Sequence, residues 1–244
     1  MIKNIILDLG GVLIDISMQN TLTEFARLGI DVQGFMDRMK NGHSVKTCPG
    51  ATMCEGVSAF GPMDEYMVGN ISTDEFMSLW MKLSRPGTTR EEVERAWNSC
   101  LFSIPQRRLD AIAELRAQGY RIYMLSNTNE AHWLHIIQEC PTLPSLFDGI
   151  FLSQELHLAK PHADIFKEVL RLIDAPADEC LFVDDSSKNT EAAAELGIHT
   201  FTADISRLQP DGTFIPPQKE WYQAINLNDK MNKTTTQTNQ NDIH

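Results

Sequence analysis

Asp8 is the first residue of the chain whose type and position could do chemistry. It ends an apolar segment of strand length, Ile2 to Leu7, and the glycines Gly10 and Gly11 follow closely. At the carboxyl end of a buried parallel strand a crevice opens toward ligand, so a carboxylate there can act as a nucleophile or a metal ligand. An aspartate that only caps the following turn is the alternative from this segment alone. The rest of the chain decides between these interpretations.

Two further apolar segments are followed by polar residues. Ser126-Asn127 follows the segment Arg121 to Leu125, and Asp184-Asp185 follows Cys180 to Val183. A lysine, Lys160, lies between these two segments and precedes an expected helix. Because the carboxyl ends of parallel strands share one edge of a sheet, we expect these side chains to converge with Asp8. Phosphoryl transfer needs such groups: a cation on the acidic residues offsets the repulsion between nucleophile and phosphate, while lysine and hydroxyl hold the phosphoryl oxygens.

The segments that position these residues alternate between helix and strand from Ser103 onward. The spacing of apolar residues predicts two helices, over Leu109 to Arg116 and Ile165 to Ile173, and two further strands, at Ile150 to Leu152 and Ile198 to Phe201. Ser103 to Gln106 has the pattern of a capping box at the start of the first of these helices. Alternation of this kind predicts an α/β fold, with a parallel sheet that helices cover on both faces.

Residues 17–103 are rich in Met and have helical spacing, which predicts a helical insertion after the first strand. Its expected helices are Thr21 to Leu28 and two that begin at capping boxes, at Ser72 to Glu75 and Thr88 to Glu91, whereas Asn41 to Asn70 is predicted to be loop-rich. The tail 226–244 is rich in Asn, Thr and Gln and is predicted to be disordered. The expected units are therefore a core of 1–16 and 104–225, an insertion of 17–103 and a disordered tail.

The composition limits the partners. The chain has 244 residues, and 21 Lys and Arg against 33 Asp and Glu give a formal net charge of −12, which disfavours binding to nucleic acid and to anionic membranes. No signal peptide and no apolar run of membrane-spanning length is evident, so a cytoplasmic location is expected. Five cysteines, an odd number, fit reduced thiols. A small phosphorylated substrate remains compatible with this charge, and the oligomeric state is not indicated.

The polar groups occur in an order that resembles the haloacid dehalogenase superfamily of hydrolases. The matching segments are Asp8-Leu9-Gly10-Gly11-Val12, Ser126-Asn127, Lys160-Pro161 and Asp184-Asp185-Ser186-Ser187-Lys188-Asn189. Within that superfamily the chain is most similar to bacterial sugar-phosphate phosphatases of the glucose-1-phosphate phosphatase type. The resemblance implies a Rossmann-like core with a helical cap domain in the position of residues 17–103, and a Mg²⁺-dependent phosphatase that acts on a small phosphorylated metabolite such as a sugar phosphate.

The resemblance also implies a role for each matching residue. Asp8 would attack phosphorus and form an aspartyl-phosphate, and Ser126 and Lys160 would bind the transferring phosphoryl group. Asn127 would form hydrogen bonds on the substrate side of the site, and Asn189 would form supporting hydrogen bonds. The Asp8 carboxylate, the Gly10 backbone carbonyl and Asp185 would hold Mg²⁺, an oxygen-only site suited to a hard cation. Asp184 would orient Lys160 or a metal-bound water, or serve as an alternative ligand.

Gly10 departs from the family pattern. Most phosphatases of the superfamily carry a second aspartate at this position as general acid and base, and a backbone carbonyl cannot protonate a leaving alkoxide. We therefore hypothesise that the substrate has an acidic leaving group, such as an anomeric hydroxyl or a phenol. Asp15 is a surrogate acid in one interpretation and a turn contact at the cap hinge in the other.

Two alternatives to a phosphatase remain open. A haloacid dehalogenase also uses the aspartate nucleophile but needs no cation, and the Asp184-Asp185 pair beside Asp8 would be hard to keep ionised without one. A binding or regulatory protein that has lost turnover is the second alternative, for which Gly10 is the hint. His132 and His135, at i and i+3 on an expected helix, are interpreted as packing residues because no acidic or thiol partner lies near them in sequence.

Overall fold

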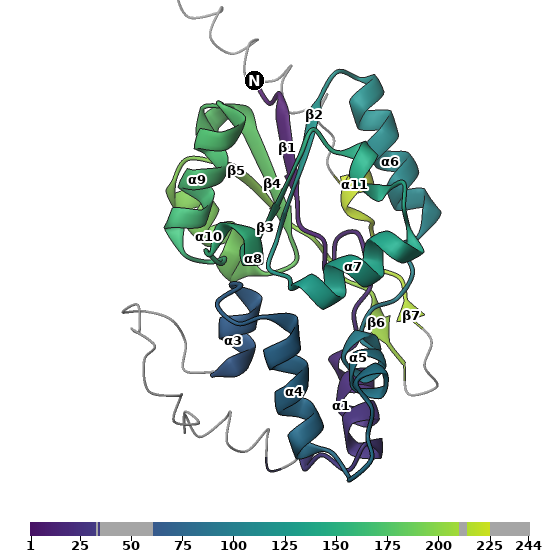
Figure 1. The fold of residues 1–244 in the computed structure, drawn as a ribbon. Helices are drawn as coiled ribbons and strands as arrows, with labels where there is room; N and C mark the ends of the chain where they lie inside the picture. The colour runs from purple at the N-terminus through teal and green to yellow at the C-terminus, as the bar shows by residue number, and fades with distance from the viewer. Residues whose placement is uncertain (33, 35–60, 210–213, 225–244) are drawn as a thin grey trace, which may run out of the picture.

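The central element of the computed structural model is a parallel sheet of five strands in the order β3-β2-β1-β4-β5 (Figure 1). The structure describes residues 1–32, 34, 61–209 and 214–224. The strands are β1 (Asn4–Leu7), β2 (Arg121–Ser126), β3 (Gly149–Leu152), β4 (Cys180–Asp184) and β5 (His199–Thr202). The predicted parallel sheet is confirmed, and each strand lies within two residues of its predicted bounds. Because β1 lies between β2 and β4, the chain order reverses beside it, and a ligand crevice is expected there.

Helices cover both faces of this sheet (Figure 1). One face is covered by α6 (Gln106–Ala117), α7 (Glu130–Glu139) and α11 (Trp221–Ala224). Ile112, Ile136 and Trp221 of these helices belong to one hydrophobic cluster with side chains of β1 and β2. On the other face, α9 (Ala163–Ile173) and α10 (Ser187–Glu195) pack through Phe166, Val169 and Ala193. The short α8 (Ser153–Leu156), η1 (Leu143–Leu146), η2 (Ala177–Glu179), β6 (Arg207–Leu208) and β7 (Phe214–Ile215) complete the described core.

A second group of helices lies beyond the carboxyl ends of the strands (Figure 1). It comprises α1 (Met18–Arg27), α3 (Pro62–Met67), α4 (Thr73–Leu83) and α5 (Arg90–Asn98). These helices have their own hydrophobic cluster, in which Phe25, Phe76, Trp80 and Trp97 pack ring against ring. We call this group the cap. Two adjacent crossings join it to the core, and the Ser17 amide donates to the Cys100 carbonyl at 2.8 Å between them.

The predicted capping boxes have three different outcomes. The Ser72 and Glu75 box at the start of α4 is confirmed, whereas the box of α5 lies one residue later than predicted, at Thr89 and Glu92. The predicted box at Ser103 is wrong, because α6 begins at Gln106 with Pro105 at its N-cap and makes no side-chain capping bond. Ser103 is therefore too far from the first turn to reach its free amides.

The segment predicted to be loop-rich contains a helix. Within Asn41 to Asn70, residues 62–67 form α3, which has Pro62 at its first turn and the buried Tyr66 facing the cap cluster. Residues 41–60 and the predicted disordered tail lie outside the described residues. Among the residues that the structure describes, no helix has both the length and the hydropathy needed to cross a membrane.

Candidate active site

Strand register places Asp8 between two neighbouring strand ends. Leu7 pairs with Met124 of β2 and with Val183 of β4, so Asp8 lies level with Leu125 on one side and Asp184 on the other. Its backbone amide donates to the Val183 carbonyl at 2.8 Å. The Leu9 amide donates to the Asp8 carboxylate at 2.7 Å, which fixes the side chain at the end of the strand.

Lys160 joins the ends of three strands. Its ammonium lies 2.9 Å from Asp8 Oδ1 and 2.6 Å from Asp184 Oδ2, and it donates to the Leu125 carbonyl at 3.0 Å. The lysine is 5% exposed and Asp184 is fully buried. A buried charge is tolerated only when it is paired and hydrogen-bonded, and the three acceptors meet that condition.

Burial governs the protonation of this cluster. It raises the pKa of Asp8 from 3.8 to about 7, although the nearby Lys160 ammonium acts in the opposite direction. For Lys160, burial alone would lower the pKa, but the carboxylates of Asp8 and Asp184 outweigh it and raise the pKa above its usual value. Burial and the neighbouring Asp184 also raise the pKa of Asp185. The site thus holds more carboxylates than one lysine can neutralise.

The three carboxylates form a set of oxygen donors that fits a divalent cation. Oxygens of Asp8, Asp184 and Asp185 lie within 4.8 Å of one another. Both oxygens of Asp184 have protein partners, because Oδ2 contacts Lys160 while Oδ1 accepts from the Ser186 amide at 2.8 Å and from Asn189 Nδ2 at 2.9 Å. Carboxylate oxygen is the donor that Mg²⁺ prefers, and a cation would lower the cost of three buried like charges.

Gly11 lets the backbone after β1 approach Asp185. Its φ of +70° is in the left-handed region, and a Cβ added there would lie 2.6 Å from Asp185 Cγ. Only glycine fits this close approach without moving the carboxylate. Gly10 lies next to it, and its backbone pairs with that of Ile14 in an isolated bridge.

The second polar segment, Ser126-Asn127, follows β2. Ser126 is 2% exposed and comes directly after Leu125, whose carbonyl binds the Lys160 ammonium. The Asn127 side chain is bound to the backbone of Lys160 at both ends: Nδ2 donates to the carbonyl at 2.8 Å, and Oδ1 accepts from the amide at 2.9 Å. The structure therefore brings Ser126 and Asn127 to the same edge as Asp8, and it shows Asn127 in contact with the loop of the lysine.

Asp15 and His132 make contacts away from this cluster. Asp15 accepts from the buried Arg108 at 2.9 Å where the chain leaves the core for the cap. His132 stacks on Trp97 with ring centroids 4.8 Å apart, and burial lowers its pKa to about 4. These positions agree with the hinge-contact interpretation of Asp15 and the packing interpretation of His132.

Asn129 and Ser153 are residues at this edge that the sequence analysis did not single out. Both are fully buried, and both contact the cap: Asn129 binds Trp97, and Ser153 binds the Met67 carbonyl. Asn129 is also the N-cap of α7 and accepts from the His132 amide. Asparagine before a helical segment is a recognisable N-cap signal, whereas nothing local in the sequence marks Ser153.

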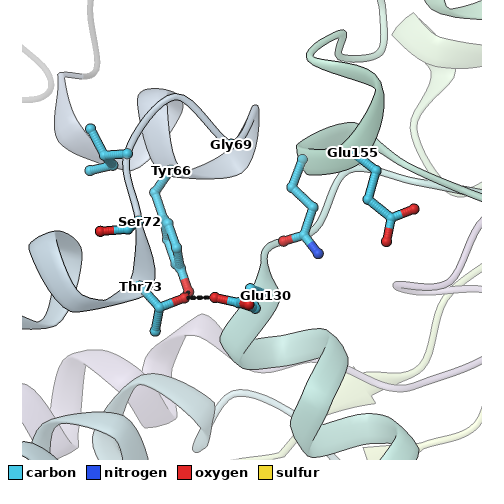
Figure 2. A pocket seen from close by; sticks show the side chains of 8 residues that line it. Tyr66, Gly69, Ser72, Thr73, Glu130 and Glu155 are labelled. Atoms are coloured by element: carbon cyan, nitrogen blue, oxygen red, sulfur yellow. Dashed lines mark hydrogen bonds between the residues drawn. The ribbon is translucent and has the colours of Figure 1, made fainter.

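A pocket of about 300 Å³ lies at the boundary between cap and core. In Figure 2, Tyr66 and Thr73 of the cap face Glu130 of the core, and the Thr73 hydroxyl donates to the Glu130 carboxylate. The Tyr66 hydroxyl lies 2.9 Å from the Thr73 hydroxyl. Glu155 of α8 lines the same pocket, whereas Asp8, Lys160, Asp184 and Asp185 do not.

Comparisons with known proteins agree with this geometry. The family model of the haloacid dehalogenase-like hydrolases matches residues 2–197. D-ribitol-5-phosphate phosphatase of Bacteroides thetaiotaomicron is 32% identical over 207 residues, which are 82% of this chain and 91% of that protein.

Solved structures have the same fold. The HAD family enzyme BT-2542 of B. thetaiotaomicron, crystallised with magnesium and inorganic phosphate, superposes with a TM-score of 0.70 at 29% identity and covers 86% of this chain and 98% of its own. The L-2-haloacid dehalogenase of Xanthobacter autotrophicus, at 18% identity and a TM-score of 0.54 over 87% of this chain and 80% of its own, shares the fold alone. The sheet, the acidic cluster and the family match together show that the chain belongs to the haloacid dehalogenase-like hydrolases.

Proposed function

We propose that the protein is a Mg²⁺-dependent phosphatase of small phosphorylated metabolites, with Asp8 as its nucleophile. A carboxylate oxygen of Asp8 forms a bond to phosphorus while the bond from phosphorus to the ester oxygen breaks, and the leaving oxygen takes up a proton. Water then attacks the phosphorus of the aspartyl-phosphate, which releases inorganic phosphate and restores the Asp8 carboxylate.

The contact of Lys160 with both Asp8 and Asp184 carries this proposal. The ammonium lies 2.9 Å from the nucleophile, so it is placed to bind phosphoryl oxygens where charge shifts in the transition state. Asp184 orients the ammonium from the other side, at 2.6 Å. Ser126 would donate its hydroxyl to a phosphoryl oxygen, and Asn127 would hold the Lys160 loop beside the substrate.

Asp8, Asp185 and the Gly10 carbonyl are the proposed ligands of Mg²⁺, with Asp184 in support. When bound, the cation supplies charge that offsets the repulsion between the carboxylate nucleophile and the phosphate dianion. The oxygens of the acidic cluster lie within 4.8 Å of one another, as such a site needs.

A sugar phosphate or sugar-alcohol phosphate is the proposed substrate class. The similarity to D-ribitol-5-phosphate phosphatase, which covers 91% of that protein, supports a small polyhydroxylated leaving group. Gly10 has no side chain that could protonate this group, so within this class the proposal favours an anomeric sugar phosphate, whose leaving oxygen is more acidic, over a primary-alcohol phosphate. Residues 17–103, whose described part consists of α1, α3, α4 and α5, are proposed to act as the cap that closes over the substrate.

Several broader properties belong to the same proposal. The excess of acidic residues argues against nucleic acid and anionic membranes as partners, and we propose that the protein acts on its substrate in the cytoplasm. A dehalogenase would need no cation, so the clustering of Asp184 and Asp185 beside Asp8 favours the phosphatase.

Phosphate release from a panel of phosphate esters tests the function directly. The panel contains an anomeric sugar phosphate, a primary-alcohol sugar-alcohol phosphate and p-nitrophenyl phosphate, each assayed with Mg²⁺ and with EDTA. We expect turnover that requires both the cation and Asp8, with Asp8→Asn as the inactive control. Release of halide from a 2-haloacid without Mg²⁺ would favour the dehalogenase, and Mg²⁺ binding without turnover on any ester would favour a binding protein.

A further inference from the structure

The loop that follows Ser126 is bound on three sides by neighbouring elements. It comprises Asn127, Thr128 and Asn129, and it links β2 to α7. Each of its side chains or backbone groups contacts a different partner: Asn127 contacts the Lys160 loop, Thr128 contacts Ser153, and Asn129 contacts the cap. We call these three residues the β2–α7 loop.

Asn129 attaches this loop to two helices of the cap. Its Oδ1 accepts from the indole Nε1 of Trp97 in α5 at 3.2 Å and from the His132 amide at 3.1 Å. Its Nδ2 lies 3.3 Å from Met67 Sδ at the end of α3 and 3.1 Å from His132 Nδ1. The side chain is fully buried, and its bonds to Trp97 and Met67 would break if the cap moved away, whereas those to His132 stay within the core.

The orientation of His132 reinforces this attachment. Since Asn129 Nδ2 is a donor, His132 Nδ1 accepts, and the proton of the ring therefore lies on Nε2, which is 3.2 Å from the Trp97 carbonyl. The same Trp97 thus contacts Asn129 through its indole and His132 through its backbone. The contact from cap to loop is directional, and only one arrangement of donors and acceptors satisfies it.

Ser153 provides a second attachment of the loop to the cap. Its hydroxyl accepts from the Thr128 amide at 3.0 Å and donates to the Met67 carbonyl at 2.5 Å. Ser153 is fully buried at the start of α8, so it fixes Thr128 and α3 relative to each other.

On its opposite side, the loop is connected to Ser126 and Lys160, the two residues proposed to bind the phosphoryl group. Asn127 binds both the amide and the carbonyl of Lys160, and the Lys160 ammonium binds Asp8 and Asp184. Ser126 precedes the loop directly. A displacement of the loop would therefore displace both groups that are proposed to hold the phosphoryl oxygens.

From these contacts we infer that Asn129 is a positioning residue, which makes the placement of Ser126 and Lys160 depend on docking of the cap through Trp97. The inference rests on the proposed function for its catalytic meaning, while the structural coupling stands on the contacts alone. Asn129 does not act on substrate itself. It transmits the position of α5 to the β2–α7 loop, and Asn127 transmits the position of the loop to Lys160.

The test compares two cap substitutions of the same size. Trp97→Phe removes the indole donor to Asn129, whereas Trp80→Phe removes an indole from the same aromatic cluster, in which Trp80 packs on Phe25 at 4.3 Å. Asn129→Ala removes the acceptor from the other side. Amide hydrogen exchange measures how often the backbone amides of Thr128 and Lys160 lose their hydrogen bonds to the Ser153 hydroxyl and the Asn127 side chain. Titration of each folded variant with inorganic phosphate, in saturating Mg²⁺, measures the phosphate site without turnover.

We expect Trp97→Phe and Asn129→Ala to speed exchange at Thr128 and Lys160 and to weaken phosphate binding by about tenfold, with kcat lowered more than KM is raised. Trp80→Phe should leave exchange at both amides and phosphate affinity close to wild type. Unchanged exchange in the first two variants, or an equal change in Trp80→Phe, would overturn the inference whether or not the enzyme turns over. Wild-type protein that hydrolyses no ester would reject the proposed function, and the exchange comparison would still decide the coupling.

Discussion

The side chain of Ile16 lies over Gly10, so that a Cβ added at Gly10 would come within 2.6 Å of Ile16 Cδ1. Ile16 is 42% exposed and stands where the chain passes from the core into the cap. The space beside the proposed nucleophile in which a second acid would lie is thus taken by the end of an apolar side chain. Because that end is flexible and partly exposed, it can turn away at small cost.

Restoring an acid at position 10 should broaden the range of leaving groups. We expect Gly10→Asp combined with Ile16→Ala to raise kcat/KM on a primary-alcohol phosphate by about tenfold or more, since general acid catalysis contributes at least that much. Gly10→Asp alone should gain less, because Ile16 Cδ1 must move first. The Ile16→Ala variant is the control, and p-nitrophenyl phosphate, whose leaving group needs no proton, should show little change. No gain on the poor leaving group would contradict the hypothesis about Gly10.

Gly11→Ala should damage the cation site more than the fold. A Cβ at Gly11 would lie 2.6 Å from both Cγ and Oδ2 of Asp185, so the carboxylate has to shift. Gly119→Ala is a matched control, because Gly119 also has a positive φ, +93°, but its added Cβ would meet nothing within 4 Å. Both variants should lose about 1 kcal/mol of stability from backbone strain. Only Gly11→Ala should raise the Mg²⁺ concentration needed for half-maximal activity, and equal Mg²⁺ requirements would argue against Asp185 as a ligand.

Mg²⁺ affinity should rise with pH until Asp8 is ionised. Burial raises the pKa of Asp8 to about 7 in the absence of a cation, so below that pH the metal must displace a proton. We expect the dissociation constant to fall by up to about tenfold per pH unit below about pH 7 and to level off above it. Calorimetry in two buffers of different ionisation enthalpy would measure the proton released. In Asp8→Asn the release from Asp8 should disappear, so that any remaining release comes from Asp185, whose pKa is also raised. A pH-independent affinity in the wild type would refute the assignment.

The polar residues of the active site could be predicted because each lies where an apolar strand ends. Asp8, Ser126 and Asp184 follow directly on buried segments, and parallel register then brings strand ends together. Asn129 and Ser153 could not be found in this way, because their contacts run to the cap, which is distant in sequence: Ser153 and Met67 are 86 positions apart. Tertiary packing, rather than local pattern, decides such positions.

The limits of helix prediction have a similar cause. The six-residue α3 was missed because a helix that short is stabilised by the burial of Tyr66 in the cap and not by its own sequence. Conversely, Ser103 has the pattern of a capping box, but Pro105 sets the start of α6 two residues later than the pattern required. A capping pattern shows where a helix can begin, and the packing of its apolar face selects the actual start.

His132 should make the protein less stable in acid. Burial lowers the pKa of His132 from 6.5 to about 4, so the unfolded chain binds a proton at a higher pH than the folded protein does. This contribution to stability is complete above about pH 6.5 and is lost as the pH falls toward about 4, by at most about 3 kcal/mol. Asp8 has a raised pKa and changes stability in the opposite direction, so denaturant unfolding is best measured in Asp8→Asn.

In that background, His132→Gln should reduce the loss of stability between about pH 6.5 and 4, because the titrating ring is gone. His199→Gln removes an exposed histidine from β5 and serves as the control. Equal acid sensitivity of the two variants would show that His132 is not the group responsible.

Arg108 and Arg107 are adjacent arginines with very different expected contributions to stability. Arg108 is 1% exposed and joins Asp15, at 2.9 Å, to Glu220, at 3.1 Å, whereas the Arg107 side chain is half exposed and forms an ion pair with Glu220 at 2.7 Å. Removing Arg108 leaves the shielded Asp15 carboxylate without a cation and Glu220 with the half-exposed Arg107, so Arg108→Met should cost about 3–5 kcal/mol of unfolding free energy. Arg107→Met should cost less than about 1 kcal/mol.

The ion pairs of Arg108 are also expected to hold the hinge. Asp15 lies beside the point at which the chain enters the cap, so its release should loosen the crossing at which the Phe102 amide donates to the Asp15 carbonyl. Adding Asp15→Asn and Glu220→Gln to Arg108→Met removes the stranded charges and should recover part of the lost stability, because much of the penalty comes from unpaired carboxylates and not from the lost bonds. If the triple variant is no more stable than Arg108→Met, the loss comes instead from the missing packing and hydrogen bond of the arginine to the Leu13 carbonyl.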